Sequence, residues 1–261
     1  MVNRGYEQRE SCDWGDGSAE AGWTDLPVEA AVQLRVDGRH LATLHCTPQH
    51  LDELARGFLL GQGYVATPED IAAVEVGADG VIEVALAGEG LKAEPAPAHR
   101  IVYSGCGQPA GQGDIGAIQS SREEERTLSP RVLRGALEET LRHGEIYRET
   151  RGVHSAGLFS CEGLSLALRE DIGRHNAFDK VLGWLSGETG LITGTIFAAS
   201  SGRISSEAVR KMARFGIPVV ISKGVPTTMA ADEARRLGVT LASSLGPARL
   251  RLYSHRYRVS P

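Results

Sequence analysis

From Val153 onward, short apolar runs alternate with amphipathic stretches in the order strand, strand, helix, strand, helix, strand, helix, strand. The strands are predicted at residues 153–159, 164–169, 195–199, 218–222 and 239–242. The helices between them are predicted to begin near His175, Ser205 and Thr227. Gly216 and Gly238 stand where a left-handed residue is expected to end two of these helices. This order predicts an α/β layer with a largely parallel portion.

The first half of the chain predicts a smaller α+β unit. Residues 28–36 and 40–45 surround Asp37-Gly38, and residues 74–76 and 81–86 surround Asp79-Gly80. Both dipeptides are strong hairpin turns, so two hairpins are expected. Between the hairpins, Thr47-Pro48 is predicted to cap a helix whose apolar stripe includes Leu54 and Phe58.

These patterns divide the chain into three parts. Residues 1–24 are rich in glycine, serine and acids without periodicity, and we expect them to be disordered or peripheral. Residues 25–128 form the predicted N-terminal α+β domain, which ends in a loop carrying Cys106. Residues 129–261 form the predicted C-terminal α/β domain, which opens with a helix at residues 129–144.

The charge of the chain is unevenly distributed. Its formal net charge is −5, yet residues 201–261 hold 11 basic and 3 acidic residues. A basic C-terminal quarter on an acidic protein favours an anionic ligand or partner there. Solvated faces of the predicted helices explain the same excess equally well, so both interpretations stay open.

The distribution of the cysteines and the hydropathy of the chain indicate in which cellular compartment the protein resides. The four cysteines are scattered and form no Cys-x-x-Cys pair, which is typical of a reducing compartment in a chain of this size. The first twenty residues are polar, so no signal peptide is expected. No apolar run approaches the ~20 residues of a membrane helix. We therefore expect a soluble cytoplasmic protein that binds neither membrane nor nucleic acid.

Cys106 is the strongest single candidate for chemistry. It lies between Gly105 and Gly107, which allow another molecule to approach the sulfur closely. A loop thiol beside backbone N–H groups can ionise more easily, and the thiolate is the reactive form. The alternative is a small buried hydrophobic residue, which is the usual state of a free cysteine. Cys46 and Cys161 fit that alternative better.

Three polar turns follow strands of the predicted α/β layer. They are residues 170–180, 200–207 and 222–228. Hydroxyls, glycines and bases at helix N-termini bind anions, and three such turns at one sheet edge predict a pocket. Zinc is not expected. The joints His175-Asn176-Ala177 and 201–204 lack the catalytic glutamate and the cysteine pair of zinc deaminases.

Several runs together resemble the formate dehydrogenase accessory sulfurtransferases, the FdhD family. They are Thr47-Pro48 through Gly57-Phe58-Leu59, Ser104-Gly105-Cys106-Gly107, residues 152–159, Glu170-Asp171-Ile172-Gly173-Arg174-His175-Asn176-Ala177 to Asp179-Lys180, Ser201-Gly202-Arg203 to Glu207, Pro226-Thr227 and residues 238–241. The likeness extends from about Leu26 to Tyr253.

The resemblance implies a cytoplasmic sulfur carrier with a cytidine-deaminase-like C-terminal domain, commonly a homodimer. Members take a persulfide from a cysteine desulfurase and pass sulfur to the bis-molybdopterin guanine dinucleotide molybdenum cofactor, which formate dehydrogenase needs. By resemblance, Cys106 would hold the persulfide. The cofactor would be held by His154, Arg174, His175, Asn176, Lys180, Ser201, Gly202, Arg203, Thr227, Ser244, Leu245, Gly246, Pro247, Ala248 and Arg249.

Two departures from the family pattern leave alternatives open. The family usually has Cys-x-x-Cys at the loop, whereas this chain has Pro109 at the second position. Ser244 and Gly246 stand where an aromatic residue and an arginine often contact the cofactor. A non-catalytic chaperone that delivers the cofactor to formate dehydrogenase is therefore a second hypothesis. A nucleobase deaminase, which would carry zinc, is a third.

Overall fold

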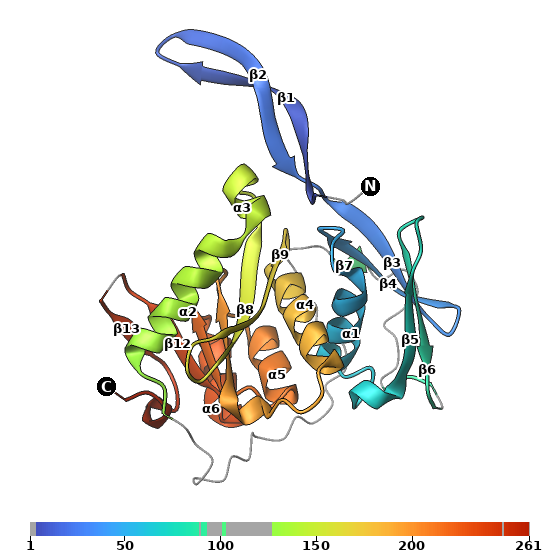
Figure 1. The fold of residues 1–261 in the computed structure, drawn as a ribbon, viewed down its shortest axis with the longest axis vertical. Helices are drawn as coiled ribbons and strands as arrows, with labels where there is room; N and C mark the ends of the chain where they lie inside the picture. Colours follow the sequence, from blue (N-terminus) through green and yellow to red (C-terminus); the bar gives the residue numbers. More distant parts are fainter. Residues whose placement is uncertain (1–3, 89, 93–100, 103–126, 247, 261) are drawn as a thin grey trace.

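The protein is described by a computed structural model, which places residues 4–88, 90–92, 101–102, 127–246 and 248–260. It has the expected mixed α/β architecture, built on a six-stranded sheet, a five-stranded sheet and a two-stranded hairpin (Figure 1). Within the described part of the chain, no helix combines the length and apolarity required to cross a bilayer.

The six-stranded sheet forms the C-terminal body. Its order is β13 (Leu250–Leu252), β12 (Thr240–Ser244), β11 (Val219–Ser222), β10 (Ile196–Ser200), β8 (His154–Ser160) and β9 (Ser165–Asp171). The three strands β10, β11 and β12 are parallel, while β8, β9 and β13 each pair antiparallel. The predicted parallel portion is therefore confirmed. The sequence interpretation missed β13 and the short α3 (Glu145–Thr150), because neither has a periodic run long enough to read.

Helices cover both faces of this sheet. One face packs on α4 (Arg174–Gly187), α5 (Ser206–Arg214) and α6 (Thr228–Leu237), and the other packs on α2 (Pro130–His143). Ser129, Ser205 and Thr227 cap α2, α5 and α6, each accepting a hydrogen bond from a backbone N–H three residues on. These three helix starts agree with the sequence prediction.

The N-terminal unit is a five-stranded sheet covered by one helix. Its order is β5 (Ile71–Val76), β6 (Val81–Leu86), β3 (Ala30–Val36), β4 (Arg39–Cys46) and β7 (Ile101–Val102). The hairpins β3–β4 and β5–β6 are those predicted, and β3 pairs with β6 in parallel to join them. Helix α1 (Leu51–Gln62) packs on the sheet, and the short η1 (Pro68–Asp70) precedes β5.

Helix α1 also packs tightly against α4 of the C-terminal body. A Cβ atom built on Gly57 would lie 1.8 Å from the carbonyl oxygen of Asp179. One built on Gly183 would lie 1.8 Å from the carbonyl oxygen of Glu53. Two glycines therefore let the helix backbones touch. The division of the chain at residue 128 stays a prediction, and Leu128 itself bridges to Val259.

Two local predictions need correction. Residues 1–24 were expected to be disordered or peripheral, and the described part is peripheral but ordered: β1 (Tyr6–Gly15) and β2 (Ser18–Pro27) form an antiparallel hairpin that projects from the body (Figure 1). Its strand pattern was hidden because acidic residues stand on both faces of the hairpin, for example Glu10 opposite Trp23 and Asp13 opposite Glu20. Thr47 does not cap α1, since the N-cap is His50, in a left-handed conformation with φ 52° and without a side-chain cap.

Candidate functional site

The three polar turns lie along one edge of the six-stranded sheet. Ser200 at the end of β10 pairs with Ser222 of β11, which pairs with Ser243 of β12. The antiparallel β8 begins at this edge with His154, which pairs with Asp171 at the end of β9. We call this the carboxyl edge, because carboxyl ends of strands are where α/β sheets present ligand groups.

Four of the predicted site residues meet at the turn after β10. The Ser201 hydroxyl lies 3.4 Å from His154 Nδ1 and accepts a hydrogen bond of 2.9 Å from the backbone N–H of Ser155. A Cβ atom on Gly202 would lie 2.9 Å from the Cβ of Arg174 and 3.4 Å from His154 Nδ1. Glycine is therefore required at position 202 for Arg174 and His154 to stand beside the turn.

His154 is a neutral group in this setting. Burial lowers the pKa of its imidazole, and the nearby charge of Arg174 lowers it further. A neutral imidazole between arginines can accept or donate one hydrogen bond without adding charge to an anion site.

The turn after β11 packs directly on the turn after β10. The Ser222 hydroxyl donates to the carbonyl oxygen of Gly202 and accepts a hydrogen bond of 3.0 Å from the N–H of Gly224. A Cβ atom on Gly224 would lie 2.9 Å from backbone atoms of Arg203. The side chains of Arg203 and Lys223 are both exposed at this joint. Lys223 was not among the predicted site residues, although it follows Ser222 in one of the polar turns.

A further turn, after β12, is held by its own hydrogen bonds. The N–H of Leu245 donates to the carbonyl oxygen of Arg249 at 2.8 Å, and the N–H of Gly246 donates to the Ser244 hydroxyl at 3.3 Å. Gly246 has φ 118°, which only glycine adopts readily. Leu245, Gly246, Ala248 and Arg249 are exposed, and Pro247 lies outside the described residues. This turn shares the carboxyl edge with the others.

His175 is buried in an ionic cluster and is not exposed at the carboxyl edge. Its Nε2 is 2.8 Å from the Ser205 hydroxyl, and its Nδ1 is 3.9 Å from the Glu207 carboxylate. Burial lowers the pKa of His175 to about 4, despite the opposing effect of Glu207. Lys211 Nζ contacts Glu207 at 3.1 Å and Asp179 at 2.7 Å. Burial opposes ionisation of Glu207, but mainly Lys211 outweighs it and lowers the pKa to about 2.

Asn176 and Lys180 serve the joint between the two halves of the chain. Lys180 Nζ is fully buried, 2.7 Å from the Asp171 carboxylate and 2.9 Å from the carbonyl oxygen of Thr47. Asn176 donates to Asp171 and to the carbonyl oxygen of His45. Neither side chain faces the open edge, so the predicted direct contact with a ligand has no support from their positions.

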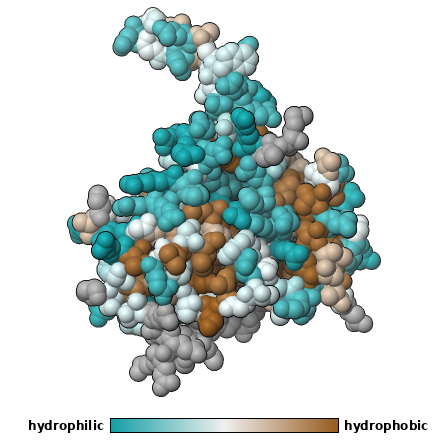
Figure 2. All heavy atoms as spheres, in the orientation of Figure 1, coloured by the Kyte–Doolittle hydropathy of each residue, from teal (hydrophilic) through white to brown (hydrophobic). Residues whose placement is uncertain are grey.

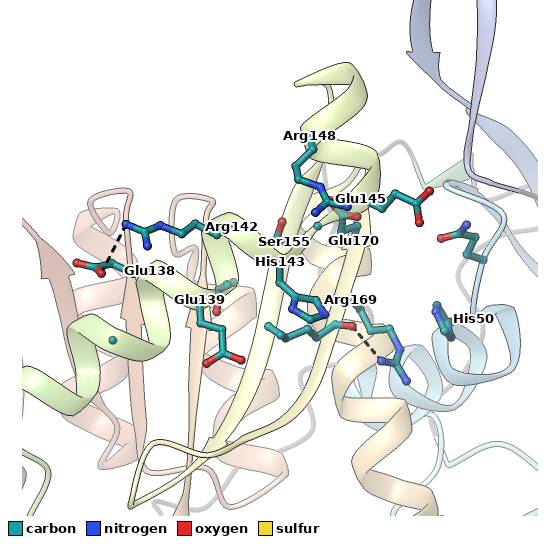
Figure 3. Close-up of a pocket in the computed structure, with 15 residues that line it drawn as sticks. His50, Glu138, Glu139, Arg142, His143, Glu145, Arg148, Ser155, Arg169 and Glu170 are labelled. Carbon is teal, nitrogen blue, oxygen red and sulfur yellow. Dashed lines mark hydrogen bonds and ion pairs between the residues drawn. The ribbon is translucent and has the colours of Figure 1, made fainter.

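A second hollow lies on the opposite face of β8 and β9 (Figure 3). This cavity of about 760 Å³ is lined by α2, α3 and the start of α1, and the sequence interpretation did not point to it. Its charged lining residues are Glu138, Glu139, Glu145, Glu170, Arg142, Arg148 and Arg169. The acids outnumber the arginines, and Arg169 is already bound to Glu53 at 2.5 Å. The cavity therefore does not favour a polyanion.

The carboxyl edge has the opposite charge character. Arg203, Lys223 and Arg249 are exposed there, and Arg174 is half-buried beside them. The two nearby acids, Asp171 and Glu207, are bound to Lys180 and Lys211. A row of exposed and half-buried cations above neutralised acids attracts an anion with several phosphates, so this edge is the candidate site.

The thiols differ in what they could do. Cys106 lies outside the described residues. Burial raises the pKa of Cys46 to about 12, which makes that thiol a poor nucleophile. The Cys161 thiol donates to the carbonyl oxygen of Thr195 at 2.9 Å, and Cys12 is exposed on the hairpin. Among the described residues, no group of three or more histidine, cysteine or acidic side chains is arranged to hold a metal.

Comparison with known proteins identifies close relatives. The model of the FdhD/NarQ family matches residues 27–260, and the match begins where the hairpin ends. A sulfur carrier protein FdhD of Geobacillus kaustophilus is 32% identical over 241 residues, covering 90% of each chain. Its counterpart in Mycobacterium bovis is 34% identical over 254 residues, covering 90% of this chain and 91% of that one. A crystal structure from Desulfotalea psychrophila, described as a formate dehydrogenase accessory protein, superimposes with a TM-score of 0.78 at 25% identity, covering 98% and 99% of the two chains.

Proposed function

Because the chain belongs to the FdhD/NarQ family, we propose that it is a sulfur carrier that supports formate dehydrogenase. It takes sulfur as a persulfide on Cys106 from a cysteine desulfurase. It then passes sulfur to the bis-molybdopterin guanine dinucleotide molybdenum cofactor, in the cytoplasm, where thiols stay reduced. The cofactor is cargo in this proposal, and neither zinc nor another resident metal takes part.

The observation that carries the cofactor assignment is the basic carboxyl edge. Arg203 and Lys223 stand on two turns that are locked together through Ser222 and Gly202. Arg249 stands on the next turn of the same edge. Phosphates bind at such turns because arginine, lysine and free N–H groups at helix starts all attract them. The neutral His154 and the Ser201 hydroxyl supply hydrogen bonds beside Arg174.

The first sulfur step is an exchange that balances without an oxidant. The Cys106 thiolate attacks the outer sulfur of the desulfurase persulfide, so one S–S bond forms as another breaks. The desulfurase leaves as a thiolate, and Cys106 carries the persulfide. Glycines on both sides of Cys106 are expected to let the two protein chains approach at this step.

The second step needs electrons from elsewhere. Outer persulfide sulfur becomes sulfide only by gaining two electrons, which two thiols supply when they form a disulfide. One of these is Cys106, which gives up its outer sulfur. A second loop cysteine would be the other, but this chain has Pro109 there. Cys46 and Cys161 are engaged in the fold. The proposal therefore requires either the exposed Cys12 of the hairpin or a thiol from another molecule.

Asn176 and Lys180 have a positioning role in this proposal. Both bind Asp171, which also accepts a hydrogen bond of 2.8 Å from the N–H of Gly173. That network fixes the backbone immediately before Arg174. A cytidine-deaminase-like assignment for residues 129–261 and a homodimeric assembly belong to the same proposal, as the family resemblance implies.

Intact-mass analysis tests the carrier function. The purified protein is incubated with a cysteine desulfurase and cysteine, and we expect a gain of about 32 Da, one sulfur atom, that maps to Cys106. Cys106→Ser should abolish the gain and fail to restore formate dehydrogenase activity in a strain lacking this protein. Cys12→Ser, which removes an exposed thiol on the hairpin, is the matched control and should load normally.

The alternative is a non-catalytic chaperone that binds the cofactor and delivers it to formate dehydrogenase. The proline at position 109 favours it, because a pure delivery function needs no second thiol. Absence of the mass gain together with full activity of Cys106→Ser would establish this alternative. Stoichiometric zinc in elemental analysis would instead point to deaminase chemistry.

A further inference from the structure

A separate pocket lies at the end of the six-stranded sheet opposite the carboxyl edge. It occupies about 440 Å³ between the C-terminal ends of α1, α4 and α5, the short η1 and the segment that leads into β10. These are the lower ends of the three helices in Figure 1. β10 runs from this end to Ser200 at the carboxyl edge, over five residues or ~17 Å. The pocket is therefore distinct from the candidate site.

The walls of the pocket are partly apolar and come from both halves of the chain. Leu60 and Leu185 are buried, and Phe215 packs against the cores of both halves. Leu191 is 38% exposed at this end of the molecule. In the view of Figure 2, apolar residues reach the surface over the middle and lower parts of the body, whereas its upper part is hydrophilic. The apolar lining residues are Leu60, Ala66, Pro68, Leu185, Leu191 and Phe215. A pocket of this volume, with apolar walls and a few polar groups, is typical of a small-molecule site.

Arg214 is the cation of this pocket. It is the last residue of α5, where a cation offsets the helix dipole, and the head of such a side chain usually stays in water. Here it is half-buried beside the end of α1, because a Cβ atom built on Gly63 would lie 2.7 Å from its Cζ. Burial lowers the pKa of Arg214, and the charge of Arg210 lowers it further. Among the residues that the structure describes, none forms an ion pair or a hydrogen bond with its guanidinium.

A half-buried guanidinium beside apolar walls defines the class of ligand. Arginine binds a carboxylate through two parallel hydrogen bonds, and loss of water strengthens such a pair. Glu69 and Glu188 also line the pocket, but both are exposed, so water and salt screen their charges. These acids and the C-terminal ends of three helices disfavour a ligand with several negative charges, such as a phosphate. A monoanion with an apolar body fits the pocket.

We propose that this pocket binds a small monocarboxylic acid, with the carboxylate on Arg214 and the apolar body against the leucines and Phe215. The ligand bridges the two halves of the chain, because α1 and η1 line one side of the pocket while α4 and α5 line the other. Binding therefore stabilises the joint between the halves. This site goes beyond sulfur transfer, since neither Cys106 nor the carboxyl edge takes part in it.

Calorimetric titration of the full chain with hexanoate, heptanoate and octanoate tests the apolar part of the pocket. Each added methylene should lower the Kd about fourfold, because it is buried on binding. 1-Octanol has the same number of carbons without the charge and should bind ~10- to 100-fold more weakly than octanoate, since hydrogen bonds to charged groups are the stronger ones. Absence of saturable octanoate binding at millimolar concentration, or equal affinity for octanol, would overturn the proposal.

Three variants locate the binding site. Arg214→Met should bind octanoate no more tightly than octanol, while its affinity for octanol stays that of the wild type. Arg210→Met removes a cation of the same helix that is bound to Glu233, so it is the matched control and should bind octanoate normally. Ala66→Trp fills the pocket from an exposed position and should abolish binding of both probes. Wild-type octanoate affinity in Arg214→Met or in Ala66→Trp would show that the probe binds elsewhere and would overturn the proposal.

A polypeptide C-terminus offers the same carboxylate chemistry, and a further probe distinguishes it. An acetylated tripeptide that ends in leucine should bind more weakly than octanoate, because its amide groups lose water on entering an apolar pocket. Tighter binding of the tripeptide would overturn the assignment to a small acid. Persulfide loading of Cys106 should be unchanged in Arg214→Met, so failure of this proposal and failure of the sulfur-carrier function are seen independently.

Discussion

Replacing Gly57 by alanine tests the tight packing of α1 on α4. The new Cβ would lie 1.8 Å from the carbonyl oxygen of Asp179, whereas real Cβ atoms essentially never approach closer than 3.0 Å. The helices must therefore separate by more than 1 Å at this point. Gaps of 0.5–1 Å forfeit about a quarter to a half of the dispersion energy of each contact.

The expected cost follows from two opposing terms. Overpacking of a close contact costs ~1–3 kcal/mol, and two rigid helix backbones place this case at the upper end. In the opposite direction, alanine inside a helix is more stable than glycine by ~1 kcal/mol. Gly57→Ala should therefore lower the free energy of unfolding by ~2 kcal/mol, which corresponds to ~4–8 °C in Tm for a chain of this length.

Gly135 in α2 provides the matched control. It is also inside a helix, but a Cβ atom there meets nothing within 4 Å. Gly135→Ala should raise the free energy of unfolding by ~1 kcal/mol. Glycine-to-alanine substitution thus changes stability in opposite directions at the two positions, and the two variants should differ by ~3 kcal/mol in the free energy of unfolding. Urea unfolding followed by circular dichroism measures this difference. Equal stability of the two variants would refute the packing argument.

Three further predictions concern charge. Lys180→Met leaves the buried Asp171 carboxylate without its cation and should lower the free energy of unfolding in urea by ~3–5 kcal/mol. Arg210→Met, at the partly exposed pair with Glu233, is the control and should lower it by less than ~1 kcal/mol. Because the folded pKa of His175 is about 4, below its ordinary value of 6.5, its contribution to stability is full above pH 6.5 and is lost as the pH falls toward 4. The stability difference between wild type and His175→Gln should shift by up to ~3 kcal/mol across that window, and a flat difference would contradict the assignment. Arg203→Ala should weaken binding of guanosine diphosphate, followed by calorimetry, about 10-fold and reduce its salt dependence, while the same change at Arg131, on α2, should not.

Local patterns predicted the elements well, because each carries its own signal. The capping residues Ser129, Ser205 and Thr227 mark helix starts, and Asp37-Gly38 marks a hairpin. The roles of Lys180 and Asn176 could not be predicted in this way. Their partners on β4 and beyond it lie more than 130 residues away in sequence, and only the folded chain brings them together. The polar run at residues 170–180 therefore combines candidate ligand groups with groups that hold the fold.

The joint between the two halves and the candidate site share one segment of backbone. Thr47 donates its N–H to Asp171 and accepts a hydrogen bond from the N–H of Ile172 on its hydroxyl. Two residues later the chain reaches Arg174, which stands beside His154 and Gly202. A displacement of the N-terminal unit that moves Thr47 must therefore move the backbone supporting Arg174, since buried hydrogen bonds are costly to leave unmade. The N-terminal unit thus helps to set the geometry of the anion site although it contributes none of the site's exposed cations.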